Sequence, residues 1–224
     1  MKLILTSLIC GLTGCSAVGH YHVDHNASAK VDLHFIGIPV LAGAIGSSFP
    51  LTKHYSLTAG HVAKIMMVRV KAYNPTCDVA IIYHDNTGRT LPKLETAVKG
   101  EKLKMYGYNA YTAMPTSSSG TLQEFGWWKK PGTSCRMALT DAGGIQGMSG
   151  GPVYGGDGAV IGVFTATHRE RNQSIFVPYQ NIANWIVGQM DGRDLASVRQ
   201  SSSSPRGSAT LFTARFPVTS THAK

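Results

Sequence analysis

A serine stands among glycines in the stretch GIQGMSGGPVYGG, residues 144–156. Glycine permits positive φ angles and a close approach of the backbone to another molecule, so Ser149 is a candidate for an exposed nucleophile. A flexible loop is the alternative, and the stretch alone does not decide between them. A serine hydroxyl becomes a good nucleophile only beside a base, and that base needs a third group to orient it. The rest of the chain must therefore supply a histidine and an acid.

Two other segments supply these groups. In HYSLTAGHVAK, residues 54–64, His61 follows a strand-like run and begins a short helical turn. In NPTCDVAIIYH, residues 74–84, Asp78 stands at the entry of an apolar strand that can hold it rigidly. Taken alone, His61 is more typical of a core or surface histidine, and Asp78 of a turn acid. Asp85, just past the strand, is the alternative acid.

The elements that must position these residues are short. Between residues 31 and 190, apolar or alternating runs are separated by turn residues, and the whole chain has 25 glycines and only 15% charged residues. This pattern indicates an all-β barrel or sandwich. The GGDG at 155–158 predicts a hairpin turn. Helical spacing then predicts one closing helix, with Asn181 as its N-cap and an apolar face made by Ile182, Trp185, Ile186 and Met190.

The segments LTAGHV, DVAII and GMSGGPV, in this order, resemble the three signature segments of trypsin-like (chymotrypsin-fold) serine proteases. VIGVFTATH is similar to the family's cleft strand, and VPYQNIANWI to its C-terminal helix. Each motif is short, so the conjunction of all of them carries the resemblance. It covers about residues 31–190 and implies two packed six-stranded antiparallel β-barrels. Only 16 residues separate His61 from Asp78, so the first barrel is expected to be trimmed.

The resemblance implies a role for each residue. Ser149 is the nucleophile, His61 the general base and then acid, and Asp78 the group that orients the imidazole. The backbone N–H groups of Gly147 and Ser149 form the oxyanion hole. No metal or cofactor is expected, and the substrate is a protein or peptide. Four residues match positions that line the substrate pocket: Gly143, Thr165, Ala166 and Thr167.

The pocket positions indicate what the enzyme would accept. Gly143 stands where relatives that cleave after Lys or Arg carry an acid, and Asp141 is out of register by two, so basic side chains are not expected. Thr167 replaces a common glycine and narrows the pocket, which favours a small or medium uncharged side chain. His168 could instead recognise an acidic one. The IVGG-like start of activated trypsins is missing, so we expect activity without proteolytic activation.

The N-terminus is typical of an exported protein. In MKLILTSLICGLTGCSA, a lysine precedes an apolar run and then small residues, which indicates a secretory signal peptide too short to span a bilayer stably. LTGC, residues 12–15, resembles the lipobox of bacterial lipoproteins. This implies removal of residues 1–14, a diacylated Cys15 and attachment in the bacterial envelope, with Ser16 matching an outer-membrane destination. An ordinary signal peptide and a soluble secreted protease are the alternative.

The two remaining cysteines and the segments on either side of the barrels give further predictions. Cys77 and Cys135 could form a disulfide in an oxidising compartment, or remain two buried thiols. Residues 15–30 read as a polar tether, and residues 191–224 as a basic, Ser-rich and disordered tail. The tether contains four possible metal ligands, His20, His22, Asp24 and His25. We prefer to interpret it as a solvated linker that is rich in histidine.

The sequence thus favours a lipid-anchored serine endopeptidase. The net charge of +9 comes without a zinc-finger, RNP or helix-turn-helix pattern, so no nucleic-acid partner is expected. A second interpretation is a protease fold kept as a binding module without turnover. Such modules usually lose a residue of the triad, and here all three are present.

Overall fold

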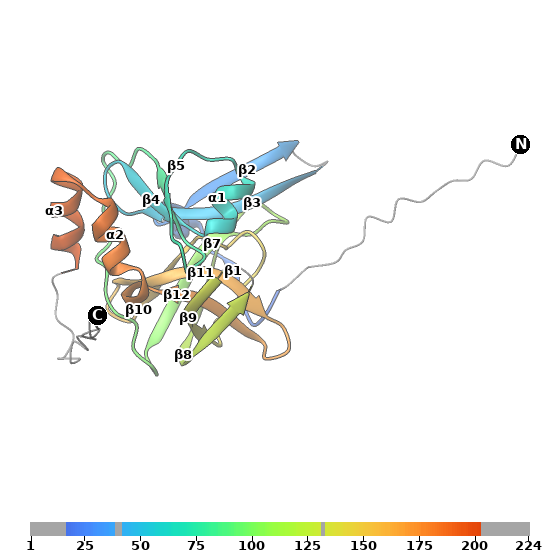
Figure 1. Ribbon diagram of the computed structural model, residues 1–224. Coiled ribbons are helices and arrows are strands. Elements are labelled where there is room, and N and C mark those ends of the chain that lie inside the picture. The colour runs from blue at the N-terminus through green and yellow to red at the C-terminus, as the bar shows by residue number, and fades with distance from the viewer. Residues whose placement is uncertain (1–16, 39–41, 131–132, 203–224) are drawn as a thin grey trace, which may run out of the picture.

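The computed structural model describes residues 17–38, 42–130 and 133–202. It consists mainly of two antiparallel sheets, which lie one above the other in Figure 1. The signal peptide with Cys15 and Ser16, and residues 203–224 of the tail, lie outside the described residues. No helix in the described ranges is long and apolar enough to cross a membrane.

The first sheet has five strands in the order β2-β3-β4-β6-β5, one fewer than the six that the resemblance implies, and makes up the trimmed barrel. Between β4 and β5 lies the short helix α1 (Gly60–Ile65). The strands span Asp32–Ile38 (β2), Ala42–Pro50 (β3), Tyr55–Thr58 (β4), Val70–Tyr73 (β5) and Ala80–Tyr83 (β6). Every residue of β4 is buried, because this central strand is covered on both faces. The prediction of a shortened first barrel is confirmed.

The second sheet contains the strands β7 to β12 and closes on itself, because β8 pairs with both β7 and β9. The short strand β1 (His22–Val23) is added at the edge of β8. The six strands of the barrel span Lys102–Tyr108 (β7), Pro115–Lys130 (β8), Thr133–Thr140 (β9), Pro152–Gly155 (β10), Val160–His168 (β11) and Gln173–Pro178 (β12). The hairpin between β10 and β11 lies at the GGDG turn, where Gly158 has a φ of +82°.

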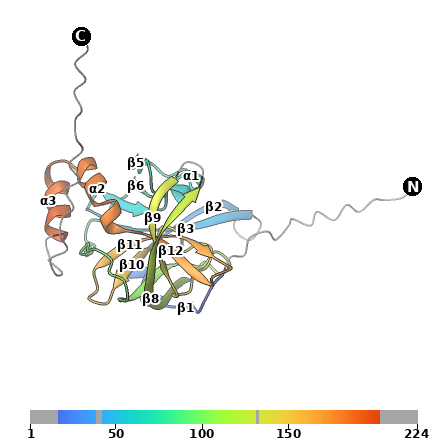
Figure 2. The same ribbon diagram turned by 60° about the horizontal axis from the view of Figure 1, so that its bottom comes forward.

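One apolar cluster joins the two sheets. It contains Leu57 and Ile81 from the first sheet, Val163 and Val177 from the second, and Ile186 from the helix α2 (Ala183–Gln189). The two barrels therefore share a core, and the loops at their junction are held from both sides. Figure 2 shows α2 and the following helix α3 (Gly192–Ser201) together at one side of the sheets.

The closing helix begins later than the sequence predicts. The 3-10 turn η2 (Tyr179–Asn181) comes first, and Ile182 occupies the N-cap position of α2. The prediction of Asn181 as N-cap is wrong, because its side chain donates to the Arg136 carbonyl instead. The apolar face is as expected: Ile182, Ile186 and Met190 are buried, and Trp185 packs against them.

Two predictions of unstructured chain are wrong in part. α3 lies in the segment expected to be disordered, and its Val198 is completely buried in the shared core. The expected tether is also ordered from Val18 onward: it forms β1 and the 3-10 turn η1 (His25–Ala29) on the second barrel. In both cases a few apolar residues suffice to order the segment, because it packs on a surface that the barrels already provide.

Within the described ranges, no group of three His, Cys, Asp or Glu side chains could hold a metal ion.

Candidate active site

His61 and Asp78 are joined by two contacts. His61 lies in the first turn of α1, and its backbone N–H donates to Asp78 Oδ1 over 2.8 Å. Its Nδ1 lies 2.6 Å from Asp78 Oδ2. A carboxylate only accepts, so this contact places a proton on Nδ1 and leaves Nε2 available as a base. A β-carbon at Gly60 would lie 2.9 Å from Asp78 Oδ1, so the glycine beside His61 leaves room for the carboxylate.

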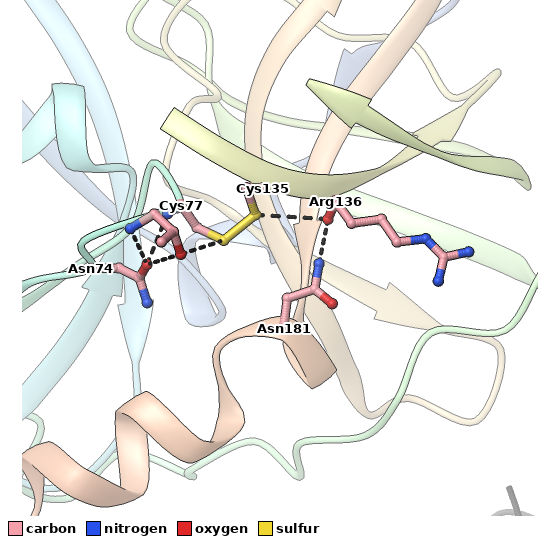
Figure 3. The surroundings of a disulfide bond; sticks show 6 residues. Asn74, Cys77, Cys135, Arg136 and Asn181 are labelled. Atoms are coloured by element: carbon pink, nitrogen blue, oxygen red, sulfur yellow. Dashed lines mark hydrogen bonds between the residues drawn. A yellow bond between two sulfur atoms is a disulfide. The ribbon is translucent and has the colours of Figure 1, made fainter. Parts of the chain in front are cut away.

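The loop that carries Asp78 is attached to the second barrel. Cys77, directly before Asp78, forms a disulfide with Cys135 of β9, and their Cα atoms are 5.0 Å apart (Figure 3). The Asn74 side chain accepts the Cys77 N–H over 2.8 Å, and the Ser134 N–H donates to the Thr76 carbonyl over 3.0 Å. The position of the acid is therefore set by both barrels.

Ser149 lies in the turn before β10, at the junction of the barrels. Its carbonyl accepts the Ser47 N–H from β3 over 2.8 Å. A β-carbon on the next residue, Gly150, would lie 3.0 Å from the backbone N of Ala59, two residues before His61. The loops of Ser149 and His61 therefore meet at this junction.

The Ser149 hydroxyl has a different partner from the one that the sequence predicts. Its Oγ donates to the Thr165 carbonyl over 3.2 Å, and in the described part of the chain no hydrogen bond joins it to His61. Catalytic hydrogen bonds are often long or misaligned without substrate and tighten when it binds. To form a hydrogen bond with His61, the Ser149 side chain would have to rotate about χ1.

The loop before Ser149 presents two backbone N–H groups. The Gln146 carbonyl accepts the Ala110 N–H over 2.8 Å, and a trans peptide then turns the Gly147 N–H to the opposite side. The Met148 carbonyl likewise accepts a bond inside the loop, over 2.9 Å, which turns the Ser149 N–H outward. Among the described residues, neither N–H has an acceptor. The two groups are free to bind a developing oxyanion.

The four residues that the resemblance places in the pocket differ in what they contact. Thr165 is buried, and its Oγ1 donates to the Ile175 carbonyl over 3.3 Å. Ala166 and Thr167 are half-buried near the end of β11. The side of Gly143 on which a side chain would stand is covered, because a β-carbon there would lie 2.2 Å from the His20 carbonyl oxygen. An acid at this position would have no space.

Sequence reasoning missed Ser174, which faces Thr167 across the pairing of β11 and β12. The Ser174 side chain is completely buried, and its Oγ has no hydrogen-bond partner within residues 17–38, 42–130 and 133–202. A β-carbon at Gly144 would lie 2.5 Å from Ser174 Oγ, 2.9 Å from the Phe164 ring and 3.1 Å from Thr167 Cγ2. These side chains fill the space next to the Gly143–Gly144 backbone. A serine in a β-strand gives no sequence signal that its side chain will be buried beside a glycine loop.

Asp85, the alternative acid for the triad, and Asp141, the acid near the pocket position, both have other partners. Asp85 Oδ1 accepts the Thr87 N–H over 2.9 Å in an exposed turn. Asp141 accepts the Thr121 N–H over 2.6 Å and also a hydrogen bond from the Gln123 side chain over 2.9 Å. Of the acids considered from the sequence, Asp78 has the contacts with His61.

No protein-family model matches the sequence, and no curated protein matches it either. Several solved structures share its fold. The Rv3671c protease from M. tuberculosis in its active form is 17% identical, with a TM-score of 0.61 over 72% of this chain and 81% of that one. The MamO protease domain from Magnetospirillum magneticum is 20% identical, with a TM-score of 0.60 over 75% and 99%. The HtrA-type protease AlgW with tripeptide is 17% identical, with a TM-score of 0.58 over 69% and 59%.

The fold is chymotrypsin-like. The structural neighbours are trypsin-like serine protease domains, several of them HtrA-type. The predicted arrangement of two barrels and a C-terminal helix is thereby confirmed. At 17–20% identity the likeness shows the fold alone, so the chemistry must be argued from the site itself.

The disulfide beside Asp78 gives a first prediction. Replacing both Cys77 and Cys135 by serine should lower the free energy of unfolding by up to about 4 kcal/mol in the chain-entropy model, given their separation of 58 residues. Urea unfolding monitored by fluorescence measures the change. Dithiothreitol should shift the parent toward the double variant and leave the double variant unchanged. Equal midpoints for the oxidised parent and the double variant would contradict this account.

Proposed function

We propose that this protein is a serine endopeptidase that cleaves peptide bonds through an acyl-enzyme. The observation that carries the proposal is the double contact between His61 and Asp78, next to a serine loop with two unengaged N–H groups. A general base must be oriented before it can activate a hydroxyl, and this geometry supplies the orientation. The side chains of His61 and Asp78 are 41% and 28% exposed, so the base is accessible to a substrate.

The proposed reaction uses only groups of this chain. The Ser149 hydroxyl turns from Thr165 toward His61 Nε2, transfers its proton and attacks the scissile carbonyl. The imidazolium that forms is stabilised by Asp78 and then gives its proton to the leaving amine. Water then gives a proton to His61 and attacks the acyl-enzyme, and His61 returns the proton to the Ser149 oxygen as the acid product leaves. The N–H groups of Gly147 and Ser149 stabilise the oxyanion in both halves, and the loss of one such donor typically costs about 10²–10³ in turnover.

A protease fold that only binds is the second candidate, favoured by the Ser149 bond to Thr165 rather than to His61. Labelling with a fluorophosphonate probe separates the two functions. The parent should react, and Ser149→Ala should abolish labelling because the nucleophile is gone. Asp78→Asn should lower turnover by about 10⁴ through the wrong tautomer of His61. Ser197→Ala, on α3, is the matched control and should label like the parent. A folded parent that does not label would leave the binding module as the function.

We further propose that Cys15 carries lipid and holds the protein at a bacterial membrane. The LTGC motif supports this proposal. So does the position of Val18, whose backbone is hydrogen-bonded to the backbone of Gly144 on the second barrel. Three Cα–Cα steps lead from Cys15 to Val18, and they allow at most about 11 Å between the two Cα atoms. The attached barrel would then lie close to the bilayer surface.

The mass of the mature N-terminal peptide tests the lipid. Diacylglycerol on an N-terminal Cys15 is the expected result, and Cys15→Ser should move the protein from the membrane fraction to the soluble one. Val23→Ala, an exposed position, serves as the control. An unmodified Cys15, or cleavage at another bond, would instead support a soluble secreted protease.

The proposed substrate has a small, uncharged side chain before the scissile bond. Ser174 and Thr167 fill the space beside Gly144, and no acid can stand at Gly143. A peptide library should therefore show a preference for Ala, Ser or Val. Ser174→Gly should raise kcat/KM for Leu relative to Ala by about 10-fold, the range that one pocket methylene commonly controls. Ser119→Gly, the same change at an exposed strand serine of β8, is the control. A parent that prefers Lys, Arg or Phe would refute this specificity.

A further inference from the structure

The segment Val18–Asp24, here called the N-terminal strap, lies along the loop that precedes the serine. The Val18 N–H donates to the Gly144 carbonyl over 2.9 Å, and the Gly144 N–H donates back to the Val18 carbonyl over 2.9 Å. Next to this bridge, backbone packs directly on backbone. A β-carbon at Gly19 would lie 2.8 Å from Gly143 Cα. The strap thus covers the Gly143–Gly144 backbone with no side chain between them.

The strap also contacts the opposite side of the pocket region. The Gly19 N–H donates to Asn172 Oδ1 over 3.0 Å. Asn172 lies in the turn between β11 and β12 with a φ of +50°, and this turn connects Thr167 to Ser174. One residue of the strap therefore joins the two segments that enclose the proposed pocket. Any movement of these segments relative to each other would break a strap contact.

The other end of the strap is fixed by side chains. β1 pairs with Thr116 and Ser117 of β8. The Asp24 carboxylate accepts a hydrogen bond from Ser117 Oγ over 2.8 Å and lies 3.0 Å from Lys104 Nζ. The hydrogen bond from Lys104 is the main cause that lowers the pKa of Asp24 below its ordinary value. The strap is therefore attached at Asp24 independently of its contacts near Val18.

The loop beneath the strap is rich in glycine, so ordering it costs conformational entropy. Gly143, Gly144 and Gly147 stand within five residues, and glycine loses more backbone freedom on ordering than other residues. The Gly144 N–H and carbonyl would lose their partners without Val18. Gly147, whose N–H is one of the two proposed oxyanion donors, follows three residues later.

We propose that Val18 and Gly19 are positioning residues: they hold the Gly143–Gly147 loop in the conformation that presents the Gly147 N–H to the oxyanion. This role deepens the proposed protease function and rests on it. The contacts of the strap with the loop use the backbone groups of Val18 and Gly19 and no free N-terminal amine. Displacement of the strap would disorder the loop and lower turnover while Ser149, His61 and Asp78 remain in place.

Val18→Pro tests the proposal, because proline removes the N–H that donates to Gly144 while keeping the carbonyl that accepts. The matched control is Val18→Thr, which keeps both backbone bonds and the shape of the buried side chain. We expect Val18→Pro to slow fluorophosphonate labelling by 10-fold or more, and Val18→Thr to stay within about 3-fold of the parent. Amide hydrogen exchange should become faster in residues 141–149 of the proline variant and remain at parent rates in β7 to β12.

Two results would overturn the role of the strap. One is parent-like labelling and parent-like exchange in Val18→Pro. The other is faster exchange throughout the second barrel, which would make the strap a general stability element. A parent that does not label refutes the proposed protease function instead, and the exchange of residues 141–149 then still decides whether Val18 orders the loop.

Discussion

The candidate site depends on one buried hydroxyl-bearing residue, Ser47 of β3. Its Oγ donates to the Gly147 carbonyl over 2.8 Å and accepts the Tyr108 N–H over 3.0 Å, while its own N–H donates to the Ser149 carbonyl over 2.8 Å. Thr58 Oγ1 donates to the Ser47 carbonyl over 2.6 Å. Each buried group left without a partner would cost about 1–3 kcal/mol. The serine loop can therefore adopt its conformation only when the first barrel is docked against the second.

This junction explains why Ser149 stands among glycines. Gly150 has a φ of +89°, and a β-carbon there would lie 2.0 Å from the Ser47 carbonyl oxygen. Gly147 has a φ of +96°, and a β-carbon there would lie 2.5 Å from the Tyr108 carbonyl oxygen. Both residues are glycines because the loop must turn sharply while its backbone contacts the backbone of two other strands. In the proposed function, the Gly147 and Ser149 N–H groups of this loop bind the oxyanion.

The sequence alone predicts the fold and the contact between His61 and Asp78, because short motifs in a fixed order carry both. The supports of the site could not be predicted in this way. Ser47 and Ser174 are ordinary strand serines, and their roles arise from contacts with residues distant in the sequence, Gly147 for Ser47 and Gly144 for Ser174. The ordered strap and α3 were missed for a related reason: polar composition predicts disorder for an isolated segment, but Val18 and Val198 are buried against surfaces that distant residues create.

The short span between His61 and Asp78 gives the disulfide its significance. That span contains the rest of α1 and the single strand β5, so the first barrel provides little backbone against which the Asp78 loop could be fixed. The second barrel provides this support through Cys135 and the Ser134 N–H. The serine loop, which belongs to the second barrel, is in turn held by Ser47 of the first. Each barrel thus positions the reactive group of the other, and the interface between them is part of the site rather than a scaffold beneath it.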